Sequence, residues 1–129
     1  YPVTGVNFNT DSYLKNAVGY GLTRDTMIWY WNQYLRDDSD KMNPYAVPSA
    51  AQEFTGLPPA LIISAGFDPL CDDASSYAEL LRQGTNSVEY YHYDGMIHGF
   101  FGMTTNLDTA QKAVSDAAGA MKTAFANLS

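Results

Sequence analysis

Two apolar segments in the second half of the chain have the pattern of strands in a parallel sheet. Residues 60–65 form an almost continuous apolar run that stops at Gly66. A continuous run is typical of a strand that is buried on both faces, whereas a strand with one solvent-exposed face alternates. Residues 88–93 are rich in β-forming side chains. We therefore predict strands at 60–65 and 88–93, with a turn at Asp94-Gly95 after the second strand.

Helical spacing connects these two predicted strands. Apolar side chains recur there at intervals of three and four residues, at Ala74, Tyr77, Ala78 and Leu81. Asp72 or Asp73 can cap the helix at its start, and Gly84 stands where a glycine often follows a helix. A strand, a helix and a strand in this order form most of a βαβ unit, and the two strands of such a unit are parallel.

Two further helices are predicted outside this unit. The first covers residues 24–35, follows the N-cap type residue Thr23, and carries more large aromatics than one buried stripe requires: Trp29, Tyr30, Trp31 and Tyr34. These aromatics fit either ordinary core packing or the wall of an apolar pocket. The second begins near Asn106 or Asp108, and we expect it to cover one face of the sheet. Residues 4–21 and 36–52 are rich in turn formers and are predicted loops.

Composition and charge exclude several classes of protein. An apolar content of 46% over 129 residues is enough for the core of one domain. The net charge of −7 argues against a nucleic-acid partner, because that affinity rests on clustered Lys and Arg. No apolar run approaches the ~18 residues of a membrane span, so we expect a soluble protein. The single cysteine, Cys71, excludes an internal disulfide and is compatible with a reducing compartment, for which we predict the cytoplasm.

The acidic stretch Asp37-Asp38-Ser39-Asp40 is the one candidate for a cation site. Three carboxylates on a predicted loop are more often solvated than metal-binding. We therefore predict no metal site. No residue pattern in the chain implies an organic cofactor.

Asp68 and His98 are the strongest candidates for catalytic residues. Each follows a predicted strand, and one helix and one strand separate them along the chain. Adjacent parallel strands would bring their carboxyl ends, and therefore these two side chains, to the same edge of the sheet. An aspartate in contact with a histidine forms two thirds of a nucleophile triad.

Each of the two also has a structural interpretation. Asp68 precedes Pro69 and could only form a turn, and His98 could be a hydrogen-bonded core histidine. Their matching positions at two strand ends favour catalysis. His92 lies inside a predicted strand, and we interpret it as structural.

Three motifs surround these residues: Leu57-Pro58-Pro59-Ala60, Ala65-Gly66-Phe67-Asp68-Pro69-Leu70 and Tyr93-Asp94-Gly95-Met96-Ile97-His98-Gly99-Phe100. Together they resemble the motifs of a known family, the hormone-sensitive-lipase-like esterases of the α/β-hydrolase fold. It implies an α/β fold in which the chain is the C-terminal part of the sheet, with about residues 7–40 contributing to a helical cap. It also implies that Asp68 is the triad acid, that His98 is the general base, and that the pocket is lined by Met27, Tyr30 and Trp31.

The chain departs from the family where the nucleophile should be. Neither the Gly-x-Ser-x-Gly elbow nor the His-Gly-Gly-Gly loop of the family occurs in it. Ser64 comes closest, but it lies inside a predicted strand. Cys71 stands where the family often has arginine, and a thiol three residues after the triad acid is not placed to attack a substrate. The chain also starts at Tyr1 rather than at Met, which favours processing or an excerpt.

From these observations we predict a carboxylic-ester hydrolase that acts on small esters of short to medium acyl chains. The nucleophilic serine and the oxyanion hole would lie on an N-terminal portion of the same enzyme, so we expect this chain alone to be inactive. A homodimer is left open. Two other classes also stay open: a non-catalytic binding module of the same fold, and an amidase or lactonase that uses the same triad.

Overall fold

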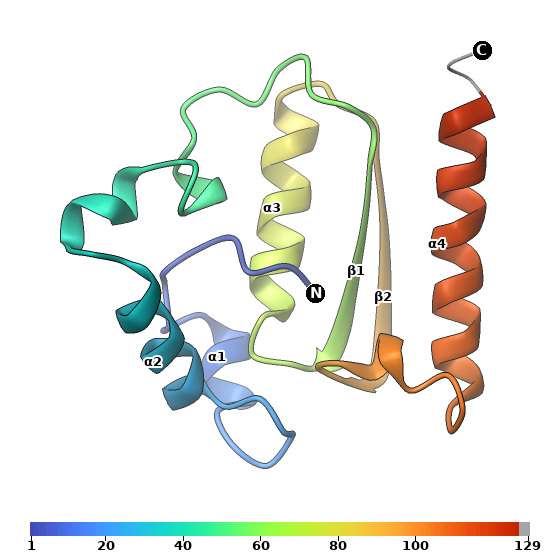
Figure 1. The fold of residues 1–129 in the computed structure, drawn as a ribbon, viewed down its shortest axis with the longest axis horizontal. Coiled ribbons are helices and arrows are strands. Elements are labelled where there is room, and N and C mark those ends of the chain that lie inside the picture. Colours follow the sequence, from blue (N-terminus) through green and yellow to red (C-terminus); the bar gives the residue numbers. More distant parts are fainter. Residues whose placement is uncertain (127–129) are drawn as a thin grey trace. The chain divides into compact units, whose positions relative to one another are not determined.

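The computed structural model describes residues 1–126, which fall into two compact units, Tyr1–His98 and the described part of Gly99–Ser129 (Figure 1). The first unit contains helices α1 (Asp11–Lys15), α2 (Arg24–Tyr34) and α3 (Cys71–Gln83), 3₁₀ turns η1 (Asp38–Met42) and η2 (Pro48–Ala50), and strands β1 (Ala60–Phe67) and β2 (Val88–Ile97). The second contains η3 (Phe100–Gly102) and α4 (Asp108–Ala126).

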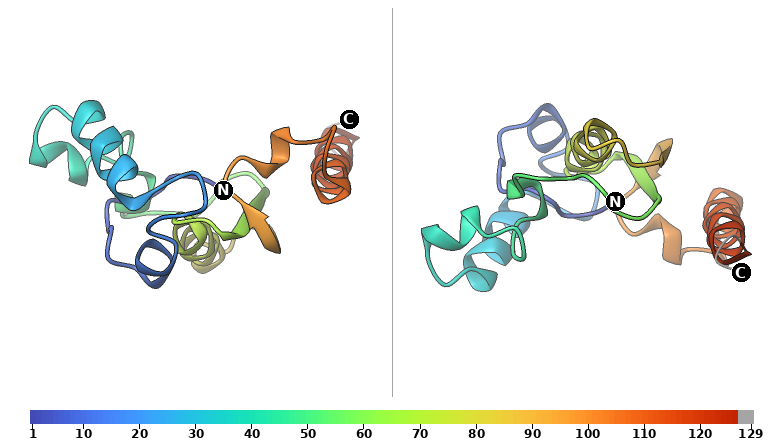
Figure 2. Two further views of the ribbon diagram at one scale, coloured as in Figure 1. Left: turned by 90° about the horizontal axis from the view of Figure 1, so that it is seen from below. Right: turned by 90° about the horizontal axis from the view of Figure 1, so that it is seen from above.

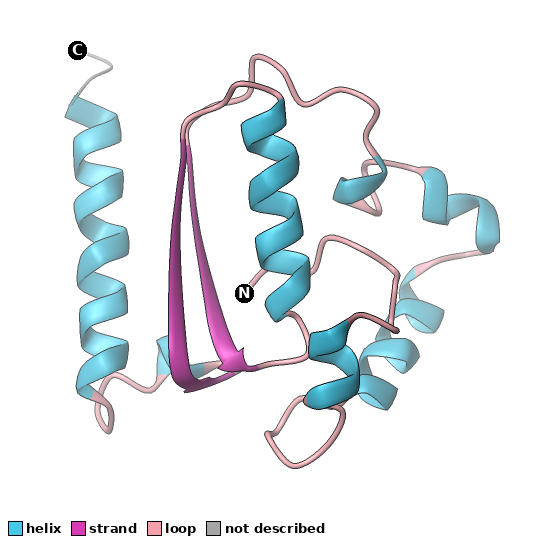
Figure 3. Ribbon diagram, turned by 180° about the vertical axis from the view of Figure 1, so that it is seen from behind, coloured by secondary structure: helices cyan, strands magenta, loops and turns pink. Residues whose placement is uncertain are grey.

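The βαβ unit predicted from the sequence is present. Strands β1 and β2 are parallel neighbours, and the crossover helix α3 packs along them (Figures 1 and 3). Apolar side chains of β1 and α3 form the core between these layers: Ile62, Ala74, Ala78 and Leu81. Burial of a side chain the size of Ile62 or Leu81 stabilises the fold by about 2 kcal/mol. The helical stripe seen in the sequence is therefore the face of α3 that covers the sheet.

Helices α1 and α2 lie on the side of α3 away from the strands (Figures 1 and 2), and a second cluster of buried residues joins them to the start of α3. Its members are Tyr13, Met27, Trp31, Val47 and Leu70. The predicted loop at 4–21 was wrong in one part, because residues 11–15 form the one-turn helix α1. A single turn is too short to show a helical period, and only the tertiary contacts of the fully buried Tyr13 reveal it.

Strand β2 is longer than predicted, and the turn expected at Asp94-Gly95 was wrong. Residues 94–97 continue the strand, with a bulge: two steps from Ala65 to Phe67 on β1 correspond to four steps from Tyr93 to Ile97 on β2. Gly66 permits this, because a Cβ there would lie 2.2 Å from the carbonyl oxygen of Asp94. The two extra residues are therefore accommodated as a bulge, and β2 continues through them to Ile97.

The predicted N-cap of α3 was also wrong, whereas Gly84 does follow the last residue of the helix as expected. The N-cap is Leu70, which makes no side-chain capping bond, and Asp72 and Asp73 lie in the first turn of the helix. Both carboxylates instead accept hydrogen bonds from N–H groups of the segment that precedes α2. Long-range pairing thus replaced the local capping that the sequence pattern favoured.

The second unit contains the predicted terminal helix, which starts at Asp108 as one of the two proposed starts had it. Its backbone connects back to η3 through a turn at Met103–Leu107. That α4 covers one face of the sheet stays a prediction. Within residues 1–126, no helix is both long enough and apolar enough to cross a lipid bilayer.

Candidate active site

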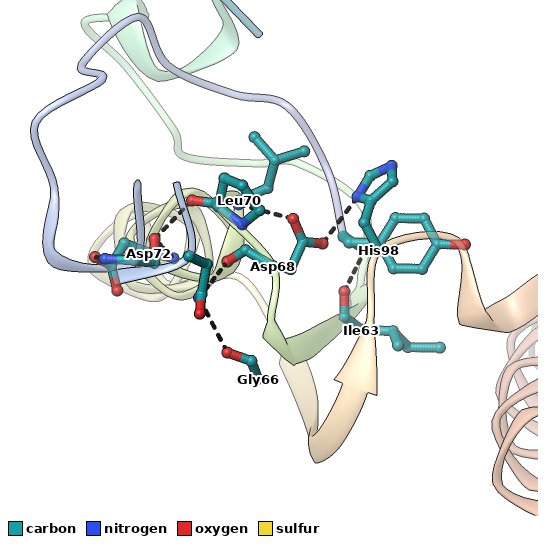
Figure 4. A network of polar contacts seen from close by, with 10 residues as sticks. Ile63, Gly66, Asp68, Leu70, Asp72 and His98 are labelled. Atoms are coloured by element: carbon teal, nitrogen blue, oxygen red, sulfur yellow. Dashed lines mark hydrogen bonds and ion pairs between the residues drawn. The ribbon is translucent and has the colours of Figure 1, made fainter. Parts of the chain in front are cut away.

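The side chains of Asp68 and His98 are in contact. Asp68 follows the last residue of β1, and His98 follows the last residue of β2. The Nδ1 atom of His98 lies 2.8 Å from Oδ2 of Asp68, as Figure 4 shows. Because a carboxylate only accepts hydrogen bonds, Nδ1 of the ring carries the proton and donates it. The parallel strands thus bring together two residues that are far apart in sequence.

Both interpretations of Asp68 hold, each for a different oxygen atom. Oδ1 accepts a hydrogen bond from the backbone N–H of Leu70 at 2.9 Å, which is the turn-forming role. Oδ2 is left to accept from His98. The side chain of Asp68 is fully buried, so these two bonds fix the plane of its carboxylate. A fixed carboxylate holds the imidazole in one orientation.

His98 is placed to act on a group outside the turn. Its side chain is 29% exposed, and the ring of Tyr1 packs against it with centroids 4.5 Å apart. With Nδ1 committed to Asp68, the other ring nitrogen, Nε2, points away from the carboxylate (Figure 4). In this tautomer Nε2 has the lone pair that a general base needs.

His92 makes a different set of contacts, which fit its interpretation as structural. Its Nδ1 lies 2.7 Å from Oγ of Ser64 on the neighbouring strand, and its Nε2 lies 2.9 Å from a carboxylate oxygen of Asp94. Ser64 Oγ also lies 2.7 Å from the hydroxyl of Tyr90. Ser64 is fully buried, so its hydroxyl links β1 to β2 and does not face a substrate.

Cys71 is the first residue of α3, and its Sγ lies 3.9 Å from Nδ1 of His92. Burial raises the pKa of the Cys71 thiol, and the negative charges of Asp72, Asp68 and Asp94 raise it further. The reactive form of cysteine is the thiolate. The surroundings of Cys71 therefore work against nucleophilic chemistry.

The Asp73 side chain, on α3, is hydrogen-bonded to the backbone near the start of the chain. Its Oδ2 accepts hydrogen bonds from the backbone N–H groups of Thr4 and Gly5, both at 3.0 Å. Burial raises the pKa of Asp73 by more than these two donors lower it. The protonated form of this carboxyl is therefore favoured more in the folded state than in the unfolded state, so ionisation of Asp73 lowers the free energy of unfolding.

We predict that Asp73→Asn removes a pH-dependent loss of stability. The contribution of Asp73 is fully present below the ordinary aspartate pKa of about 4 and is lost as the pH rises through the raised pKa of the folded state. Asparagine keeps an oxygen acceptor for both N–H groups but never ionises. Urea unfolding of the complete protein at a series of pH values should show that the free energy of unfolding of the variant increases relative to that of the wild type as the pH rises. Parallel pH curves for the two proteins would contradict this.

The three residues predicted for the substrate pocket do lie together. Met27, Tyr30 and Trp31 line a cavity of about 350 Å³, together with Tyr34, another aromatic of the same helix that the sequence offered as a pocket wall. The sequence did not indicate the remaining walls: Val3, Tyr45, Ala46 and Pro48. Met27 and Trp31 also belong to the buried cluster around α1 and α2, so the same two side chains take part in core packing and in the cavity wall. Tyr30 is 52% exposed and contributes its side chain to the open side.

The acidic loop has a structural explanation. Asp40 pairs with Arg36, with 2.7 Å between Oδ1 and Nη2, and hydrogen bonds from Arg36 lower the pKa of Asp40 to about 2. Asp38 lies 2.6 Å from Nζ of Lys41. Across residues 1–126 there is no group of three or more His, Cys, Asp or Glu side chains that could hold a metal ion.

A carboxylate and an imidazole in contact at the carboxyl edge of a parallel α/β sheet have the arrangement that the α/β hydrolases use for the acid and base of their triad. Comparison with known proteins agrees with this class. Residues 1–102 match the family model of the α/β-hydrolase fold. The chain belongs to this family, in its hormone-sensitive-lipase-like esterase branch.

Three relatives illustrate the similarity. The chain is 39% identical over 104 residues to carboxylic ester hydrolase LipN of Mycobacterium tuberculosis, covering 80% of this chain and 28% of LipN. It is 30% identical over 118 residues to an acetyl esterase of Salmonella typhi, covering 92% of this chain and 36% of that enzyme. A solved ester hydrolase from the metagenome of Lake Arreo is 38% identical, with a TM-score of 0.88, covering 97% of this chain and 40% of that one. The chain thus spans well under half the length of each.

Proposed function

We propose that this chain is the part of a carboxylic-ester hydrolase that supplies the acid and the base of the catalytic triad. The observation that carries the proposal is the 2.8 Å contact between Asp68 Oδ2 and His98 Nδ1 at the ends of two parallel strands. The names of the relatives, which are esterases and ester hydrolases, support the same reaction. The nucleophilic serine and the oxyanion hole would come from an N-terminal portion of the enzyme that precedes the sequence of this chain.

In the proposed mechanism, His98 moves a proton twice. Its Nε2 atom accepts the proton of the attacking serine hydroxyl and then donates it to the oxygen of the leaving alcohol. Asp68 holds the ring in the tautomer that leaves Nε2 unprotonated at the start and stabilises the imidazolium that forms. Water then attacks the acyl-enzyme, with the same two proton transfers in the same order. The buried carboxylate of Asp68 suits this role because solvent cannot compete for Oδ2.

The experiment that tests the proposal is the hydrolysis of a short nitrophenyl ester by the complete protein. We expect turnover that a serine-directed phosphonate abolishes, with one equivalent of label per active site. The 129-residue chain by itself should show neither turnover nor label. A complete protein that binds esters without hydrolysing them would favour the non-catalytic binding module, and faster cleavage of matched amides or lactones would favour those substrates.

We further predict that the enzyme prefers short to medium acyl chains. The cavity beside α2 measures about 350 Å³, and its aromatic walls at Tyr30 and Trp31 limit how far an alkyl chain can extend. A panel of nitrophenyl esters should give kcat/KM values that fall at the longest acyl chains. A rate that still rises beyond about twelve carbons would contradict this assignment.

A further inference from the structure

We propose that Asn16, assisted by Ser12, positions the triad acid, and that α1 thereby couples the cap segment to the catalytic pair. The proposal rests on the proposed function, since it concerns the same Asp68 and His98. Both residues belong to the short helical segment: Ser12 lies inside α1, and Asn16 is its C-cap. Four residues apart on a helix, they face the same way, towards the turn that follows β1.

Asn16 holds the backbone of that turn on both sides of Phe67. Its Nδ2 atom donates to the carbonyl oxygen of Gly66 at 3.2 Å and to the carbonyl oxygen of Asp68 at 3.1 Å (Figure 4). The residue is only 2% exposed. One side-chain amide therefore fixes two peptide groups, one at the end of β1 and one just after Asp68. The chain leaves the strand between them, so the position of the Asp68 carboxylate is fixed as well.

An amide suits position 16. Its NH₂ group carries two hydrogens on one uncharged nitrogen atom, so it can donate one to each of the two carbonyl oxygens. At the other end of the side chain, Oδ1 of Asn16 is buried and has no hydrogen-bond partner within residues 1–126. Within this part of the chain the side chain is therefore held through its NH₂ group.

Ser12 fixes the next part of the same turn. Its hydroxyl donates to the carbonyl oxygen of Pro69 at 2.6 Å and accepts from the backbone N–H of Asp72 at 3.1 Å. Its own backbone N–H donates to Oδ2 of Asp72 at 2.8 Å. Together the two side chains of the α1 segment bond to four backbone groups between Gly66 and Asp72, one of which is the carbonyl oxygen of Asp68 itself.

Losing these hydrogen bonds should disturb the geometry of the Asp68–His98 pair and leave the binding of the substrate unchanged. Asp68 reaches His98 through a single 2.8 Å contact, so a small shift of the turn misplaces the imidazole for proton transfer. Neither Asn16 nor Ser12 lines the cavity beside α2. Loss of the Asn16 amide should therefore lower kcat and leave KM close to its wild-type value.

Asn86 provides a matched control at the opposite end of the strands. It lies just before β2, and its Nδ2 also donates to two backbone carbonyl oxygens, those of Leu81, at 2.9 Å, and of Phe54. Asn86→Ala removes the same type of double contact, together with the hydrogen bond that its Oδ1 accepts from the N–H of Leu57 at 2.8 Å, and should lower the unfolding temperature at least as much. It does not touch the turn that carries Asp68.

The experiment compares Asn16→Ala, Asn16→Asp and Asn86→Ala in the complete protein. We expect kcat to fall about 10- to 100-fold in both Asn16 variants with KM unchanged, and kcat to stay at the wild-type level in Asn86→Ala. Asn16→Asp keeps the shape of the side chain but turns oxygen atoms towards both carbonyls, so shape alone should not rescue it. Equal kcat in Asn16→Ala and Asn86→Ala, whether both fall or neither does, would overturn the proposal.

A spectroscopic readout separates this proposal from the proposed function. The proton shared between His98 Nδ1 and Asp68 should give a low-field NMR signal, which Asn16→Ala broadens or shifts and Asn86→Ala leaves in place. This signal reports positioning even if the wild-type protein hydrolyses no ester, in which case only the proposed function fails. If Asn16→Ala does not fold, Ser12→Ala decides the same question. Its control is Ser12→Thr, which keeps the hydroxyl. An unchanged signal in Ser12→Ala overturns the proposal.

Discussion

Replacing His98 with alanine in the complete protein is expected to reduce kcat for a short nitrophenyl ester by roughly 10⁶-fold. The variant lacks the imidazole that contacts Asp68 and that we propose takes the proton of the nucleophile. KM should change little, because His98 does not line the cavity beside α2. Steady-state kinetics on purified protein, with the circular dichroism spectrum as a check of folding, measures the effect.

Asp68→Asn should reduce kcat by about 10⁴-fold through a different route. The new amide can still accept the N–H of Leu70 through its oxygen, so the turn is kept. Its NH₂ group then faces Nδ1 of His98 and forces the proton of the ring onto Nε2. A ring in that tautomer cannot accept the proton of the serine.

His92→Ala is the matched control for the histidine, and Asp94→Asn is the control for the aspartate. His92 and Asp94 form a second imidazole–carboxylate contact of 2.9 Å on the same strand, outside the candidate site. Both control variants should keep kcat near the wild-type value. If His98→Ala retained more than about a hundredth of the wild-type kcat, or if His92→Ala lost as much, the assignment of the base to His98 would be wrong.

Gly66→Ala is expected to destabilise the protein by about 3 kcal/mol. The added Cβ would lie 2.2 Å from the carbonyl oxygen of Asp94 and within 3 Å of two further backbone atoms of that residue. Backbone atoms in a paired strand cannot rotate away as a flexible side chain can, so one of the two strands must move. Urea unfolding of the complete protein, followed by fluorescence, measures the loss.

Gly95→Ala tests the same bulge without the clash. A Cβ at Gly95 meets no heavy atom within 4 Å, and the residue is exposed. We expect a change of no more than about 0.5 kcal/mol in the free energy of unfolding. Similar losses for Gly66→Ala and Gly95→Ala would show that the close approach of the two strands at Gly66 has no special role.

Several elements could be predicted because their cause is local. The apolar run of β1 and the helical stripes of α2 and α3 follow from burial, which repeats with the period of the element. The segment α1 and the partners of Asp72 and Asp73 could not be predicted. Their contacts join residues about sixty or more positions apart, and a local pattern contains no record of such a contact.

The sequence by itself determined that an acid and a base follow two strands of one βαβ unit. The apolar runs of the strands, the helix between them and the lengths of the connections predict this unit. Because parallel strands end at the same edge of the sheet, they also place the acid and the base at one edge. The resemblance of the motifs added the expected roles of Asp68 and His98, which remain proposals for the experiments above.

Only the tertiary structure decided that these two side chains meet. Without the bulge, the regular register that pairs Ala65 with Tyr93 would leave His98 two residues, or about 6.6 Å, beyond the level of Asp68. The two extra residues of β2 remove this offset, so that Phe67 pairs with Ile97 and the next residues face each other. Gly66 makes room for the bulge, and the hydrogen bonds of Asn16 hold the turn beside it. Register is a property of two paired strands and their packing, and neither strand specifies it alone.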